Sequence, residues 1–110
     1  MRAKHRIVFL GLLLLLCQCG KKAGLIDTHF IGIWNGHDNV SLYRLSIDQH
    51  SNAFWDRETN GHIVSTQGVA WIRNGDLHVG VKSLVINQYP VYDSASGEWN
   101  MILSGVTYTR

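Results

Sequence analysis

Apolar and polar residues alternate along most of the chain with a period of two, and no window shows a convincing helical period. Side chains at alternate positions of an extended segment lie on one face of a sheet. Three such faces are expected, formed by Tyr43, Leu45 and Ile47, by Leu77, Val79 and Val81, and by Trp99, Met101 and Leu103. The pattern predicts strands at His29–Asn35, Val40–Ile47, Ala53–Thr59, His62–Thr66 continuing into Val69–Arg73, Leu77–Ile86 and Trp99–Thr109.

Gly and Asn residues separate these segments at short intervals. Asn60-Gly61 and Asn74-Gly75 predict type I′ hairpin turns, because both central residues of such a turn need a positive φ. Around Ser104-Gly105 the alternation changes phase, which favours a β-bulge at Gly105. Consecutive strands joined by hairpins predict an all-β antiparallel meander. Closing the sheet removes its exposed edges, so we expect a small barrel, with a two-sheet β-sandwich as the alternative.

The first residues follow a different pattern. Basic Arg2, Lys4 and Arg6 precede Ile7–Leu16, ten residues without a polar side chain. A helix of that length covers about 15 Å, half of a bilayer core of roughly 30 Å, so it is too short to span. A basic start followed by a short apolar run is typical of a signal peptide, which we expect at residues 1–18.

The segment Leu16-Cys17-Gln18-Cys19-Gly20 resembles the end of a bacterial lipoprotein signal, in which a Leu stands three residues before the acylated Cys. The resemblance implies lipidation of Cys19, with Cys17 as the alternative, and a membrane partner held through the N-terminal lipid. Residues 19–28 would then be a lipidated tether and residues 29–110 the barrel domain. Gly20 stands where enteric bacteria use Asp for inner-membrane retention, so the expected location is the bacterial cell envelope, at the outer membrane.

Composition changes when this leader is set aside. From Cys19 onward the chain has seven Lys or Arg against eight Asp or Glu, a formal net charge of −1. Without a basic patch, nucleic-acid binding is not expected. No Cys follows Cys19, so the domain is expected to fold without an internal disulfide.

The opening of the domain, Phe30-Ile31-Gly32-Ile33-Trp34-Asn35-Gly36, resembles the Gly-x-Trp first strand of lipocalin-type barrels and of small lipocalin-like bacterial lipoproteins. The closing stretch Trp99–Arg110 is similar to the last strand of those lipoproteins. The resemblance implies a barrel with Trp34 plugging one end and Arg110 packed over it by a cation–π contact.

Candidate chemistry is sparse. His29, His37, His50, His62 and His78 are scattered and mostly fall near expected turns, so no metal site and no cofactor are predicted. Asp76 and His78 are interpreted as an outward pair beside inward Leu77 and Val79. No Gly-x-Ser-x-Gly elbow, phosphate loop or close carboxylate pair occurs, and we expect a protein that is not an enzyme.

Aromatic residues are the remaining candidates for a binding site. The tryptophans are expected mainly in the core, and adjacent Phe54 and Trp55 must face opposite ways. One hypothesis is a binding module for a small apolar ligand or an envelope component. The other is a protein with a filled core that acts through its surface as an inhibitor, adaptor or assembly factor for an envelope protein. The candidate ligand-binding residues are Trp34, Trp55, Trp71, Tyr89 and Tyr92.

Overall fold

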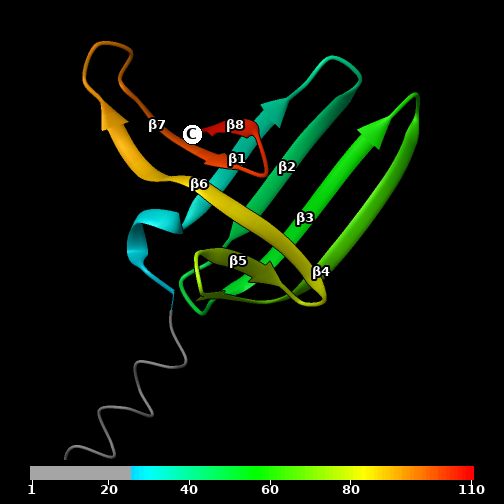
Figure 1. Ribbon diagram of the computed structural model, residues 1–110, viewed down its shortest axis with the longest axis horizontal. Coiled ribbons are helices and arrows are strands. Elements are labelled where there is room, and N and C mark those ends of the chain that lie inside the picture. Colours follow the sequence, from blue (N-terminus) through cyan, green and yellow to red (C-terminus); the bar gives the residue numbers. More distant parts are fainter. Residues whose placement is uncertain (1–25) are drawn as a thin grey trace, which may run out of the picture.

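The computed structural model describes residues 26–110, which form eight antiparallel strands and one short 3₁₀ helix (Figure 1). The predicted signal peptide, both cysteines and most of the expected tether lie outside the described residues. The elements are η1 (Thr28–Phe30), β1 (Gly32–His37), β2 (Ser41–Ile47), β3 (Asn52–Thr59), β4 (His62–Arg73), β5 (Asp76–Val79), β6 (Lys82–Asp93), β7 (Glu98–Leu103) and β8 (Val106–Thr109).

Each strand pairs with the next in sequence, and β8 pairs with β1 to close a barrel (Figure 1). The closing seam is short, with Asn35 opposite Thr109 and Gly36 opposite Tyr108. The predicted all-β meander barrel is confirmed, and the sandwich alternative is excluded. An eight-stranded antiparallel barrel is consistent with the lipocalin-like architecture that the Gly-x-Trp opening implied.

Two-residue turns set most of the strand boundaries. Asn60 and Gly61 have φ values of 51° and 80°, and Asn74 and Gly75 have 53° and 79°, which confirms both predicted hairpins. The bulge expected at Gly105 is wrong. Ser104 and Gly105, at 47° and 81°, form a third such turn, so the change of phase marks the start of a new strand.

The predicted strand Leu77–Ile86 is also wrong as a single element. It is divided by a turn at Gly80 and Val81, with Val79 opposite Lys82, and Val81 is 99% exposed instead of sharing an inward face. A tertiary contact explains the turn, because a Cβ added at Gly68 would lie 2.6 Å from the Cα of Gly80. Only a residue without a side chain permits this approach of two backbones.

The start and middle of the domain differ from expectation in two places. His29 and Phe30, expected as the start of a strand, belong instead to η1, because Asp27 caps the turn by accepting a hydrogen bond from the His29 N–H at 2.9 Å. Strand β6 runs through Pro90, where its register with β7 shifts between Gln88 and Val91. The irregularity accommodates a residue that has no N–H to donate.

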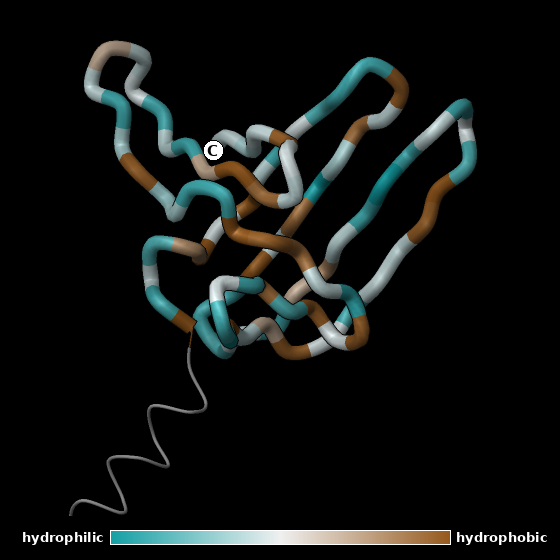
Figure 2. The backbone as a smooth tube through the Cα atoms, viewed as in Figure 1, coloured by the Kyte–Doolittle hydropathy of each residue, from teal (hydrophilic) through white to brown (hydrophobic). Residues whose placement is uncertain are grey.

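The barrel interior is filled by side chains, as expected for eight strands. Phe54 and Trp55 face opposite ways as predicted, with Trp55 buried and Phe54 exposed. Trp71, expected in the core, is 38% exposed because its neighbour Ala70 occupies the inward position. Figure 2 shows apolar segments gathered around η1, β5 and the middle of β6, and a more hydrophilic β3–β4 hairpin. The buried core consists of Ile26, Phe30, Trp34, Leu45, Ile47, Ala53, Trp55, Ala70, Leu77, Val79, Leu84, Met101, Leu103 and Tyr108.

Strand β2 offers a matched test of this inside–outside pattern. Leu45 is fully buried, whereas Leu42 on the opposite face is exposed. Leu45→Ala is expected to lower the free energy of unfolding by about 2–5 kcal/mol, because it removes buried methyl groups and leaves a cavity. Leu42→Ala should change it by less than about 0.5 kcal/mol. Urea unfolding followed by tryptophan fluorescence measures both values, and equal losses would contradict the assigned register.

Candidate functional site

One end of the barrel is closed by the residues that carry the lipocalin resemblance. Trp34 is fully buried and donates its Nε1–H to the Phe30 carbonyl at 2.9 Å. The Arg110 guanidinium lies 4.8 Å from the Trp34 ring centre and 5.0 Å from that of Trp99, so the expected cation–π contact is confirmed. A Cβ at Gly32 would lie 2.8 Å from Arg110 Cδ, which explains the glycine before Trp34. Packing at this end leaves Trp34 inaccessible to a ligand.

A pocket of about 160 Å³ lies on the inner side of the sheet, away from the residues around Trp34. It is built by inward positions of β2, β3 and β8, together with the start of β6, the end of β7 and the β7–β8 turn. We call it the mouth pocket. Its lining consists of Tyr43, Trp55, Arg57, Lys82, Leu84, Leu103, Ser104, Val106 and Tyr108.

Three aromatic rings form one wall of the mouth pocket. Trp55 donates its Nε1–H to the Tyr108 hydroxyl oxygen at 3.2 Å. The Tyr43 ring lies 6.2 Å from that of Trp55 and 6.1 Å from that of Tyr108, distances typical of tilted and edge-to-face aromatic pairs. Burial raises the pKa of Tyr108 to about 12, so its phenol stays protonated at neutral pH.

Two cationic side chains join these rings. The Lys82 Nζ lies 4.4 Å from the Trp55 ring centre in a cation–π contact. Arg57 is half-buried, two positions beyond Trp55 on the same face of β3. Nearby, Tyr43 donates its O–H to Asp38 Oδ2 at 2.8 Å. Hydrogen bonds from the Val40 N–H, the Tyr43 O–H and the Ser41 N–H hold the pKa of Asp38 below its usual value.

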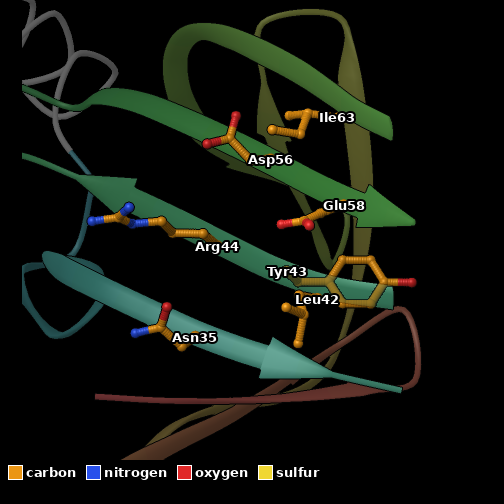
Figure 3. A pocket seen from close by; sticks show the side chains of 7 residues that line it. All are labelled: Asn35, Leu42, Tyr43, Arg44, Asp56, Glu58 and Ile63. Carbon is orange, nitrogen blue, oxygen red and sulfur yellow. The ribbon is translucent and has the colours of Figure 1, made fainter. Parts of the chain in front are cut away.

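The outer face of β1–β4 carries a second, larger depression of about 290 Å³ that is open to solvent, and Figure 3 shows its lining residues. Arg44, Asp56 and Glu58 project from β2 and β3 on this face, with Leu42 and Ile63 beside them (Figure 3). Charges of both signs and apolar side chains are mixed there. Such a mixture is ordinary for the solvated face of an antiparallel sheet.

The five candidate ligand-binding residues lie in separate places. Trp34 is at the closed end and Trp55 is in the mouth pocket. Trp71 stacks on His78 outside the barrel, with ring centres 4.0 Å apart. Tyr89 meets the edge of Phe30, and Tyr92 lies beside Trp99 on the β6–β7 hairpin. The structure therefore brings only Trp55 of this set to the pocket, and a ligand-binding role for the set remains a prediction.

Sequence reasoning missed the polar members of the mouth pocket. Arg57 was not among the candidate residues, although its position in the alternation of β3 matches that of inward Trp55. Alternation along β3 was the available signal. Lys82 gave none, because its position depends on the turn at Gly80 and Val81.

The remaining candidate groups lie apart from one another in the described part of the chain. Asp76 and His78 flank inward Leu77 and Val79 as predicted, and His78 packs on Trp71. Within residues 26–110, no group of three or more His, Cys, Asp or Glu residues is placed to hold a metal ion. No helix in that range is long and apolar enough to cross a membrane.

Comparison of the chain with protein-family models, with curated proteins and with solved structures finds no match in any of the three. The strand order of this structure alone therefore identifies the fold.

Tyr108 links the mouth pocket to stability at high pH. Its pKa is raised from 10.0 to about 12 by burial, so between these values the unfolded chain releases a proton that the folded chain keeps. The free energy of unfolding is expected to fall by on the order of 2 kcal/mol as the pH rises through this window. Urea unfolding at several pH values measures the slope.

Tyr108→Phe should flatten that slope, because the replaced ring cannot ionise. The contribution of Tyr43, whose pKa is raised by its hydrogen bond to Asp38, remains in the variant and provides the baseline. An identical slope in both proteins would show that Tyr108 titrates normally in the folded state.

Proposed function

We propose that the protein is a non-catalytic binding module that holds a small ligand in the mouth pocket. The observation that carries the proposal is the convergence of three aromatic rings and two cationic side chains on one concave site of the barrel. Ligand sites commonly combine an apolar lining with a few convergent polar groups. The lining has no carboxylate or imidazole to act as a general base, which supports binding over catalysis.

The filled interior limits the size of the ligand. At about 160 Å³ the mouth pocket is comparable with a cavity of roughly 150 Å³ that accommodates benzene. A single ring or a short chain fits, whereas a long acyl chain would have to displace buried residues such as Leu84 and Leu103. The expected ligand is therefore a compact molecule, part of which protrudes into solvent.

We propose further that the barrel is anchored in a bacterial envelope, at the outer membrane, by lipidation of Cys19, with Cys17 as the alternative. Support comes from the leader pattern at residues 1–18 and from Leu16 three positions before Cys19. Two or more acyl chains on one residue anchor a protein stably, whereas a single chain does so only marginally.

A second candidate function is an adaptor or inhibitor that acts on another envelope protein through its surface. Strand β4 favours it. Residues 62–69 of this strand pair with β3 on one side, whereas on the other side β5 pairs only with Ala70–Arg73. In a two-residue hairpin the pair next to the turn is hydrogen-bonded, so the N–H and C=O groups of Ile63 and Ser65 point away from β3. Such an edge accepts an added strand. Exposed Phe54 lies on β3, whereas exposed Tyr89 and Tyr92 lie on β6, which is not its neighbour, so the edge is the stronger feature.

The ligand proposal is tested by filling the mouth pocket. Val106 is half-buried in its lining, whereas Val85 faces outward on β6. Native mass spectrometry of the full chain after incubation with an envelope extract should show a retained small molecule. Val106→Phe should lose it through steric exclusion, and the control Val85→Phe should keep it.

Retention of the molecule by Val106→Phe would place binding elsewhere. Absence of any bound molecule, together with protection of the Ile63 and Ser65 amides from hydrogen exchange when extract proteins are added, would favour the surface-acting candidate.

Anchoring is tested separately. Cys19→Ala is expected to abolish acylation and release the protein from the membrane fraction, because the acylated sulfur is removed. Metabolic labelling with a fatty acid and fractionation measure both effects. Release by Cys17→Ala instead would move the site to Cys17, and labelling of neither cysteine in the unaltered protein would contradict lipidation.

A further inference from the structure

We propose that the ligand of the mouth pocket carries an anionic group, a carboxylate, sulfate or phosphate, bound by Arg57 and Lys82 and attached to a compact apolar body. This inference rests on the proposed function and specifies the chemistry of that same site.

The charge of the lining is the first argument. Arg57 and Lys82 both line the mouth pocket, and no Asp or Glu does. Within residues 26–110 neither cation forms an ion pair, and the buried Arg57 Nε has no hydrogen-bond partner. Taking a cationic group out of water without a counter-charge is unfavourable, so two such groups on one concave site favour an anion as occupant.

Unused hydrogen-bond donors are the second argument. The Tyr108 oxygen accepts from Trp55, and the Ser104 Oγ accepts from the Val85 N–H at 3.0 Å, so each hydroxyl keeps its own proton to donate. A neutral phenol at Tyr108 and a hydroxyl at Ser104 therefore add donors to those of Arg57 and Lys82. A site rich in donors selects a ligand group that accepts several hydrogen bonds at once.

The nearest acid does not neutralise the site. Asp38 accepts hydrogen bonds from the Val40 and Ser41 N–H groups and from the Tyr43 O–H, all at 2.8–2.9 Å. Its carboxylate is thereby held beyond Tyr43 and is not part of the lining. Tyr43, with its proton committed to Asp38, presents its ring to the pocket.

The rest of the lining determines the other half of the ligand. Trp55, Leu84, Leu103 and Val106 provide apolar surface next to the cations. Lys82 packs over the Trp55 ring, so an anion that contacts Lys82 lies close to an aromatic wall. A flat or short apolar group bearing one anionic substituent satisfies both halves of the pocket.

Two probes of the same shape separate charge from shape. Sodium benzoate and neutral benzamide, each with a single ring of the size that the pocket admits, are titrated by calorimetry into the full chain at neutral pH. The acid anion is expected to bind at least about tenfold more tightly than the amide, because a hydrogen bond to a charged group contributes more than one to a neutral group.

Three variants assign the effect to residues. Arg57→Gln and Lys82→Gln remove one charge each and keep most of the side-chain bulk. Each is expected to weaken benzoate binding about tenfold while leaving benzamide binding unchanged. Arg44→Gln is the matched control, because Arg44 is exposed on the outer face of the same sheet and should not affect either probe. Near-ultraviolet circular dichroism confirms that each variant keeps the native core.

The outcomes separate this inference from the proposed function. Equal binding of the two probes, unchanged by Arg57→Gln and Lys82→Gln but blocked by Val106→Phe, would overturn the anionic assignment and leave the binding function standing. No binding of either probe by the folded protein would overturn both. Loss of benzoate binding in Arg44→Gln as well would show attraction by general surface charge instead of a site, and would also overturn the inference.

Discussion

The stacking of Arg110 on Trp34 and Trp99 stabilises the shortest strand pairing of the barrel, that between β1 and β8. Strands β1 and β8 share only two residue pairs, so hydrogen bonds alone connect them weakly. The guanidinium links both strands and β7, and it also donates to the His29 carbonyl at 3.0 Å, which joins η1 to the seam. Gly32 leaves the space for this side chain. The closed end of the barrel depends on this one arginine and its two aromatic neighbours.

With that end packed and the interior filled, the mouth pocket and the edge of β4 are the two features that support the proposed binding functions. The short β5 matters here, because four residues cannot cover the whole length of β4. The upper part of the β3–β4 hairpin therefore diverges from β6, as Figure 1 shows. Arg57 on β3 and Lys82 at the start of β6 both line the mouth pocket. The shortness of β5 leaves the free edge of β4.

Local chemistry allowed much of this fold to be predicted. The dipeptides Asn60-Gly61 and Asn74-Gly75 are sufficient to predict their hairpin turns. The alternation of apolar and polar residues identifies the inward face of β2 and the burial of Trp55. Ser104-Gly105 and Gly80-Val81 were misread because neither contains the Asn-Gly signal, and the second depends on contact with Gly68. The mouth pocket was beyond prediction for the same reason. Arg57 adjoins Trp55 along β3 itself, but Lys82 reaches the Trp55 ring only when strands distant in sequence are brought together.

The order of the strands also has a kinetic meaning. All pairings except one join consecutive strands through short turns, so most contacts form between residues close in sequence. The exception brings together Asn35 and Thr109, about seventy residues apart, and fixing so large a loop has an entropic cost that few new contacts offset. Chains rich in local contacts fold faster than those that rely on distant ones. The meander is thus expected to assemble early, with the joining of its first and last strands as the late step.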